Sequence, residues 1–189
     1  MTKNQIEDKY SAFPAELKSV KQFVCWVGSD KIPKNPYTGN NAQSNNPTTW
    51  GTFDEAVAAC VQYNFDGIGF MFAPPFFGVD LDHCLDNVDF CDEFVETLQS
   101  YAEISKSGEG IHIICKGKLP DGARRRGGIE MYSKGRYFIC TGNVYNKSYV
   151  KVKDCTEAIK ILHSKYLPDN TPKSVLKWSI ALRSPIHPT

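Results

Sequence analysis

The sequence has neither paired metal-binding cysteines nor a long apolar run. Its seven cysteines, at positions 25, 60, 84, 91, 115, 140 and 155, include no Cys-x-x-Cys pair, which disfavours a structural zinc site. An odd number of cysteines, mostly inside apolar segments, fits free buried thiols in a reducing compartment better than a disulfide framework. No apolar run reaches the roughly 18 residues of a membrane span, and the polar N-terminus has no signal-peptide core. The sequence therefore predicts a soluble intracellular protein without a membrane partner.

The chain also has almost no net charge and no internal repeats. A net charge of +1 over 189 residues gives no global attraction to nucleic acid or membrane, so any polyanion site must be a local patch. The length suffices for one sizeable hydrophobic core. We expect one domain over residues 1–168. Residues 169–189 are expected to form a C-terminal helix and a proline-containing tail, typical of the start of a linker.

Apolar periodicity predicts strands flanked by helices. Strands are expected at 23–27, 68–72, 76–81, 101–105, 111–115, 129–132 and 136–140, and helices near 15–20, at about 53–63, after 86–89, from Asp154 and at 173–182. Residues 30–49, rich in Pro, Asn, Gly and Thr, predict a long loop. The strands 68–72 and 76–81 are interpreted as one hairpin, and 129–132 and 136–140 as another. The fold class is therefore α+β with an antiparallel or mixed sheet.

The strand at 76–81 leads into two aspartates, Asp80 and Asp82, separated by one leucine. Side chains alternate along a strand, so both carboxylates project from the same face. Adjacent carboxylates repel, and burying either without compensation is costly. A divalent cation with oxygen ligands, such as Mg²⁺ or Mn²⁺, removes this cost. The pair therefore predicts a metal platform, although such triplets also occur in ordinary turns and caps.

A glycine-containing polar segment precedes the strand that carries His112. In Ser105-Lys106-Ser107-Gly108-Glu109-Gly110, glycines let backbone N–H groups converge on an anion, and the hydroxyls and the lysine add donors. The alternative is an ordinary hairpin loop followed by a structural histidine. The nest and the histidine together favour a triphosphate cradle.

Three further features lie between residues 124 and 137. Glu130 is a charged residue inside an apolar strand. If this strand lies beside Asp80, Glu130 supplies a third carboxylate for a two-metal site. The alternative is a solvent-facing position on a half-exposed strand. Arg136 suits bidentate phosphate recognition, and Tyr137 can pack against a sugar; a surface salt bridge and a core aromatic are the alternatives. The triplet of Arg124, Arg125 and Arg126 forms either a solvated loop or a grip on a template backbone.

These motifs follow one another in a fixed order. The series is Phe-Gly-Val-Asp-Leu-Asp (77–82), Ser-Lys-Ser-Gly-Glu-Gly-Ile-His (105–112) and Gly-Gly-Ile-Glu-Met-Tyr-Ser-Lys-Gly-Arg-Tyr-Phe (127–138), ending in Cys-Thr-Gly-Asn (140–143). It resembles the catalytic domain of primase-polymerases of the archaeo-eukaryotic primase superfamily, of the type carried by phages and plasmids. Val-Cys-Trp-Val (24–27), Pro-Lys-Asn-Pro (33–36) and Thr-Trp-Gly-Thr-Phe-Asp-Glu-Ala (49–56) are also similar, so the resemblance covers about residues 15–145.

The resemblance implies an RRM-like catalytic sheet with flanking helices and an α/β module around a central cleft. It implies a template-dependent nucleotidyltransferase, a DNA polymerase and/or primase, which adds (d)NMP to a 3′-hydroxyl by a two-metal mechanism with Mg²⁺ or Mn²⁺. The expected partners are a DNA template and primer, dNTP and/or NTP, and a helicase domain downstream. The expected location is the cytoplasm of a prokaryotic cell or phage-infected host.

The resemblance also implies residue roles. Asp80, Asp82 and Glu130 would hold the metal ions. The phosphates of the incoming nucleotide would bind Ser105, Ser107, Gly108, His112, Arg136 and, as a weaker match, Lys34. Tyr137 would lie beneath the sugar and influence the choice between dNTP and NTP, and the arginine triplet would contact DNA. In one departure, many relatives have Ser-x-His where this chain has Gly110 two residues before His112.

Two other functions fit parts of the pattern. A Mn²⁺-dependent glycosyltransferase also uses Asp-x-Asp, on a nucleotide-sugar diphosphate, but it predicts a parallel, doubly wound sheet. A catalytically inactive RRM-like nucleic-acid-binding module needs basic and aromatic residues instead of three carboxylates.

Overall fold

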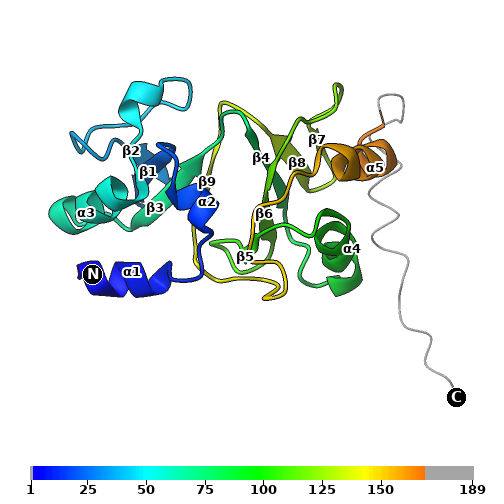
Figure 1. Cartoon of the computed structure of the whole chain (residues 1–189), viewed down its shortest axis with the longest axis horizontal. Coiled ribbons are helices and arrows are strands. Elements are labelled where there is room, and N and C mark those ends of the chain that lie inside the picture. The colour runs from blue at the N-terminus through cyan, green and yellow to red at the C-terminus, as the bar shows by residue number, and fades with distance from the viewer. Residues whose placement is uncertain (1, 169–189) are drawn as a thin grey trace, which may run out of the picture.

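The computed structural model describes residues 2–168, which form two antiparallel sheets with helices on their outer sides (Figure 1). The first sheet has the order β2 (Ile32–Lys34), β1 (Phe23–Val27), β3 (Gly67–Met71) and β9 (Tyr137–Ile139). The second has the order β5 (Ala102–Ile104), β6 (Ile111–Lys116), β4 (Phe76–Leu81), β8 (Ile129–Tyr132) and β7 (Arg125–Arg126). Every pair of these strands is antiparallel. The α+β prediction is confirmed, whereas its RRM-like detail stays a prediction.

Five α-helices accompany the sheets in the described part of the chain: α1 (Lys3–Lys9), α2 (Ala15–Lys18), α3 (Phe53–Tyr63), α4 (Val88–Leu98) and α5 (Thr156–Tyr166). A capping box begins α3, because Thr52 Oγ1 accepts from the Glu55 amide at 3.2 Å while the Glu55 carboxylate accepts from the Thr52 amide at 2.8 Å. None of the described helices is long and apolar enough to cross a membrane. The helix predicted at 173–182 and the tail at 169–189 lie outside the described residues.

The two sheets have separate cores. Aromatic side chains fill the core between the first sheet and α1 to α3, with Phe23, Phe53 and Phe70 in edge-to-face contact. The second core lies between the second sheet and α4 and α5, where every second residue of β4, including Val79 and Leu81, is fully buried. The period of two along β4 thus sends one set of side chains into this core and the other set to the opposite face.

The opposite face of the second sheet is buried at one end of its strands and borders a cavity at the other end. Phe76 of β4 and Ile114 of β6 are buried in the core of the first sheet, so this end of the face is covered. Gly78 permits the close approach, since a Cβ there would lie 2.4 Å from ring atoms of both Phe72 and Phe138. Further along, the same face carries Asp80 and opens into a cavity.

Both predicted hairpins are wrong, and the reason is the presence of two cores. β3 and β4 belong to different sheets, as do β8 and β9, so residues 72–75 and 133–136 cross from one sheet to the other. Phe70 of β3 and Phe76 of β4 meet in the first core, with ring centroids 5.4 Å apart, while Phe77 packs in the second core, so β3 and β4 contact each other through side chains instead of pairing their backbones. The two crossovers place the polar end of the second sheet against the first sheet.

Three local predictions also need correction. Cys84, which follows β4, forms a disulfide with Cys91 of α4, although we expected only free thiols; the other five cysteines are free and buried. The loop at 30–49 contains β2 and a 3₁₀ turn at Pro47–Thr49. The helix expected from Asp154 begins at Thr156, and its N-cap residue is Cys155. The Asp154 carboxylate lies before the cap and accepts from the Thr156 amide at 2.9 Å.

Candidate active site

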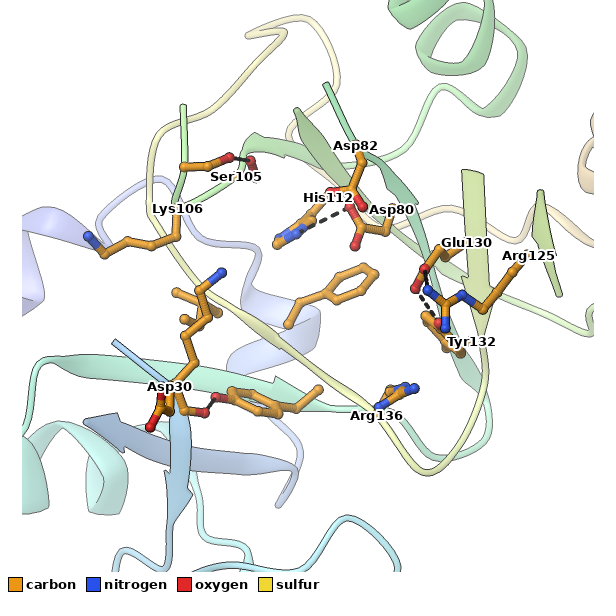
Figure 2. Close-up of a pocket in the computed structure, with 15 residues that line it drawn as sticks. Asp30, Asp80, Asp82, Ser105, Lys106, His112, Arg125, Glu130, Tyr132 and Arg136 are labelled. Atoms are coloured by element: carbon orange, nitrogen blue, oxygen red, sulfur yellow. Dashed lines mark hydrogen bonds and ion pairs between the residues drawn. The ribbon is translucent and has the colours of Figure 1, made fainter. Parts of the chain in front are cut away.

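Five strands of the second sheet each contribute one polar residue to a single row. The register pairs Glu103 of β5 with His112 of β6, His112 with Asp80 of β4, Asp80 with Glu130 of β8, and Glu130 with Arg125 of β7. Directly opposed residues in antiparallel strands share a face and have neighbouring Cβ atoms. The row therefore places Asp80 between His112 and Glu130, as Figure 2 shows.

The row borders a cavity of about 410 Å³ between the two sheets (Figure 2). Most of the candidate residues from the sequence line it: Asp80, Asp82, Ser105, Ser107, His112, Arg125, Glu130, Arg136 and Tyr137. They come from both sheets and from the loop between β5 and β6. The fold thus brings together residues that are up to 57 positions apart in the sequence, from Asp80 to Tyr137.

Asp80 occupies the most unfavourable electrostatic position in the row. Burial, followed by the negative charges of Asp82 and Glu130, raises the pKa of its carboxyl group to about 7, and the positive charges of Lys31 and Arg125 oppose this rise only in part. Its Oδ1 atom is buried and has no hydrogen-bond partner. A carboxylate in this position lacks a compensating cation.

His112 is held as a neutral ring beside Asp80. Its ring stacks on Phe138 with a centroid separation of 4.2 Å and an interplanar angle of 18°. Burial lowers the pKa of His112 to about 4, and the Ile139 backbone carbonyl opposes this shift without making a well-formed hydrogen bond. Nε2 lies 3.5 Å from Asp80 Oδ1, too far for a strong hydrogen bond. The imidazole can therefore offer a hydrogen bond to a ligand but brings no positive charge at neutral pH.

Glu130 is already engaged on both of its carboxylate oxygens. Arg125 forms an ion pair with Oε1, and the Tyr132 hydroxyl donates to Oε2. The resemblance implies that Arg125 contacts DNA; in the structure its charged partner is this carboxylate, and the contact with DNA stays a prediction. Glu130 becomes available to a ligand only if it exchanges these two partners.

The donor set of the row fits a divalent cation in part. Asp80 and Asp82 offer hard carboxylate oxygens, and the orphaned Oδ1 of Asp80 and the raised pKa of Asp80 both mark a position where positive charge is missing. Within residues 2–168, however, no group of three or more His, Cys, Asp or Glu side chains is arranged to hold a metal ion. The third carboxylate, Glu130, is engaged by Arg125 and Tyr132 in this arrangement.

The loop between β5 and β6 presents hydroxyl groups to the cavity. Ser105 Oγ and Ser107 Oγ lie 3.0 Å apart, and Ser105 Oγ also accepts from the Gly110 amide at 3.3 Å. Lys106 lines the same cavity. Gly108 has a φ of +81° and lies outside this cavity, at the edge of a neighbouring one. The hydroxyl contact missing at Gly110 is thus available from Ser105 and Ser107.

The structure also explains the glycine at position 110. A Cβ on Gly110 would lie 2.2 Å from the Leu81 carbonyl oxygen, so the loop packs directly against the end of β4. We expect Gly110→Ala to lower the stability by about 2 kcal/mol or more, because backbone atoms on both sides have to move. Thermal unfolding measures this. An unchanged melting temperature would contradict the close approach of the loop to β4.

The first sheet supplies the opposite wall of the cavity. Lys31, in the β1–β2 turn, lines the cavity, whereas Lys34 points elsewhere and its Nζ donates to Asn41 Oδ1 at 2.8 Å. The Tyr137 hydroxyl donates to the Lys31 carbonyl, and burial raises the pKa of Tyr137 to about 12. Lys31 itself has a φ of +55°. The lysine that the first sheet contributes to the cavity is therefore Lys31, three residues before Lys34, which the resemblance suggested.

The remaining arginines of the triplet contact the protein itself. Arg124 donates to the Pro120 carbonyl, and Arg126 donates to the Pro168 carbonyl at 2.6 Å. Neither lines the cavity of the row. Their predicted contact with DNA stays a prediction.

A comparison with known proteins extends this picture. No protein-family model matches the chain. The chain is related to a phage primase-polymerase. It is 36% identical over 148 residues to the DNA primase-polymerase of Nitratiruptor phage NrS-1, and the match covers 69% of this chain. The same match covers 21% of the relative, so the chain spans about a fifth of that protein's length.

Sequence reasoning alone did not single out several residues of the cavity. Asp30, Tyr132, Phe138 and Ile139 line it but were not singled out as site residues. Tyr132 lies two residues after Glu130 on the same strand face, which is the one local signal that could have indicated it. Asp30 and Lys31 lie in a turn, where only the three-dimensional arrangement shows which side chain faces the carboxylates.

Proposed function

We propose that this chain carries the nucleotidyl-transfer site of a template-dependent polymerase, acting as a DNA polymerase and/or primase. The observation that carries the proposal is the position of Asp80 between His112 and Glu130, in a cavity that Lys31 and Arg136 also line. The relationship to a phage primase-polymerase supports the same assignment. The reaction joins the α-phosphate of a (d)NTP to a 3′-hydroxyl and releases pyrophosphate.

The carboxylates form the part of the site that would bind metal. In this proposal Asp80 and Asp82 hold a divalent cation, Mg²⁺ or Mn²⁺, and Glu130 joins them after exchanging Arg125 and Tyr132. Divalent ions in such sites activate the attacking oxygen and stabilise the negative charge that develops on the phosphates. We propose that two ions bind, as in the two-metal mechanism that the resemblance implies, and metal titration measures their number.

The opposite wall and the β5–β6 loop would bind the triphosphate. Lys31 and Lys106 line the cavity from two directions, and Arg136 adds a guanidinium that has no ion-pair partner among the described residues. Ser105 and Ser107 contribute hydroxyl donors. These groups face a carboxylate cluster of opposite charge, so a nucleotide bound with its cation would satisfy both walls.

Two aromatic residues shape the rest of the site: Tyr137 forms a wall for the sugar, and Phe138 holds the His112 ring. Tyr137 is fixed by its hydrogen bond to the Lys31 carbonyl, so its ring forms a stable wall against which a sugar can pack. Phe138 holds the His112 ring by stacking, which keeps Nε2 directed toward the Asp80 carboxylate. His112 would donate a hydrogen bond to a phosphate oxygen from this position.

The two rival functions are less well supported. The glycosyltransferase alternative predicts a parallel, doubly wound sheet, whereas all named strand pairs of residues 2–168 are antiparallel. An inactive nucleic-acid-binding module has no use for a buried carboxylate such as Asp80, whose ionisation burial and neighbouring charges oppose. The glycosyltransferase alternative also leaves the relationship to a primase-polymerase without an explanation.

A synthesis assay tests the proposal directly. Purified protein is incubated with a single-stranded template, with and without an annealed primer, and with dNTPs or NTPs supplied separately in Mg²⁺ or Mn²⁺. We expect template-dependent products that disappear in EDTA. Products from the primed template alone would indicate a polymerase, and products without a primer would indicate a primase. The absence of products in every combination would contradict the proposal.

Lys31 and Lys34 offer a matched pair of variants for the nucleotide site. We expect Lys31→Ala to raise the KM for dNTP about 10-fold or more, because a charged hydrogen bond to phosphate contributes about 1.5–3 kcal/mol. Lys34→Ala should leave the KM within about two-fold, since Lys34 contacts Asn41 outside the cavity. Steady-state extension kinetics measure both. Equal effects of the two substitutions would remove Lys31 from the site.

A further inference from the structure

A second cavity lies beside the candidate active site and has a different chemistry. Its volume is about 530 Å³, and its lining includes Pro33, Gln43, Ser44, Asn45, Arg136 and Tyr137. Arg136 and Tyr137 line both cavities, so the second cavity lies directly next to the first. A ligand that extends past Tyr137 from one cavity enters the other.

The lining of the second cavity contains no carboxylate, in contrast to the first. It offers two carboxamides, a hydroxyl group and one guanidinium, next to the flat surfaces of Pro33 and Tyr137. In the described part of the chain, the Ser44 and Asn45 side chains have no hydrogen-bond partner, and Gln43 uses only its Oε1, which accepts from Asn46 at 3.1 Å. Several donors and acceptors are therefore free to bind a ligand.

Hydrogen bonds hold the backbone of the loop segment 42–45 that carries these side chains. Trp50, which is 3% exposed, donates its Nε1–H to the Gln43 carbonyl at 2.8 Å. The Gln43 amide donates to Thr49 Oγ1 at 3.0 Å, and the Ala42 amide donates to the Pro33 carbonyl of β2 at 2.8 Å. The backbone at residues 42–43 is thus fixed by a buried side chain and by a strand, while the side chains at 43–45 face outward. A preorganised site loses less conformational entropy on binding.

We propose that this second cavity binds an unpaired nucleobase of a single-stranded template, immediately beside the reaction site. Carboxamides form paired hydrogen bonds with base edges, and an aromatic ring stacks on a base. Gln43 and Asn45 supply the carboxamides, and Tyr137, which lines both cavities, supplies the ring. The inference rests on the proposed function in assigning the strand to the template. It adds that residues 43–45 give the protein a preference among template bases.

The inference is tested by binding, without catalysis. Fluorescence anisotropy is recorded for labelled 12-nucleotide strands of dA, dC and dT, with the wild-type protein, with a Ser44→Ala/Asn45→Ala double variant, and with Asn40→Ala. Asn40 lies in the same loop segment, is exposed and lines neither cavity, so it serves as the matched control. Each titration is repeated at several salt concentrations. The same wild-type preparation is assayed for extension of an annealed primer.

We expect the wild-type protein to prefer one homopolymer over another by about 3-fold or more. The double variant should weaken binding to the preferred strand by about 5-fold or more and reduce the preference, because a bidentate contact to a base contributes about 1–3 kcal/mol. Its salt dependence should stay that of the wild type, since base contacts release no counterions. The Asn40→Ala protein should bind as the wild type does.

Three results would overturn the inference: no binding of any strand by the wild-type protein, equal binding of all three strands, or equal binding by the wild-type and double-variant proteins. If free dNTP abolished the part of the binding that the double variant loses, the inference would also be overturned, because the cavity would then take the incoming nucleotide. Failure of the proposed function has a separate signature. In that case the wild-type protein shows a base preference that the double variant lacks but does not extend the annealed primer.

Discussion

Asp80→Asn is expected to reduce template-directed primer extension by at least about 100-fold while leaving the fold intact. The substitution keeps the shape of the side chain and removes the charge from the central position of the row, between His112 and Glu130. Preorganised charges at a site of developing charge typically contribute factors of about 10²–10³ to the rate. Neither Asp82 nor Glu130 can replace Asp80, because Asp82 lies beyond the end of β4 and Glu130 is engaged by Arg125 and Tyr132.

A matched control is available a few residues further along the chain. Asp86 is exposed, lies after β4 and lines neither cavity, so Asp86→Asn makes the same chemical change outside the site. We expect its extension rate to equal that of the wild-type protein. Circular dichroism and single-turnover extension in Mg²⁺ and in Mn²⁺ measure fold and activity. An Asp80→Asn protein that extends primers at the wild-type rate in either metal would falsify the assignment of the row as the reaction site.

The elements of this site were accessible from the sequence because their signals are local. The strand 76–81 is indicated by a short apolar run that follows Pro74 and Pro75, and the capping box at Thr52 marks the start of α3. The three motifs around Asp80, His112 and Glu130 could be recognised individually in the same way. Each of these signals depends on residues within a few positions of one another.

The arrangement of these elements was not accessible, because it depends on contacts between distant segments. The hairpins were mispredicted since Phe70 and Phe77 pack in different cores, which no local pattern indicates. The register that sets Asp80 opposite both His112 and Glu130 is likewise a property of three strands at once. For the same reason, the arginine triplet did not indicate the ion pair of Arg125 with Glu130, while its contact with DNA stays a prediction.

The second large effect concerns stability and follows from the same charge cluster. In EDTA, we expect Asp80→Asn to be more stable than the wild-type protein above pH 7 and equal to it near pH 4. Burial and the charges of Asp82 and Glu130 raise the pKa of Asp80 from 3.8 to about 7. An unfolded aspartate titrates near 4, so between about pH 4 and 7 the folded state binds the additional proton and its stability decreases as the pH rises. Below this range both states are protonated and the cost disappears.

The size of the effect follows from the pKa difference. Each pKa unit corresponds to about 1.4 kcal/mol, so the raised pKa corresponds to at most about 4 kcal/mol above pH 7. The Asp80 side chain is 19% exposed and partly hydrated, so we expect about 2–3 kcal/mol, or a rise in melting temperature of about 5 °C. Thermal unfolding of both proteins between pH 4 and pH 8 measures the difference, in which titrating groups that do not interact with Asp80 cancel. Asp86→Asn should show no such pH-dependent gain.

The same measurement separates a site built for a cation from a structural carboxylate. If Asp80 and Asp82 bind a divalent ion, Mn²⁺ should stabilise the wild-type protein and not the Asp80→Asn protein, so the gap between their melting temperatures narrows or reverses as Mn²⁺ is added. A carboxylate that served the fold alone would give a less stable asparagine variant at every pH. A stability gap that is independent of both pH and Mn²⁺ would show that the charge of Asp80 is compensated within the protein, and the case for a metal at this position would be lost.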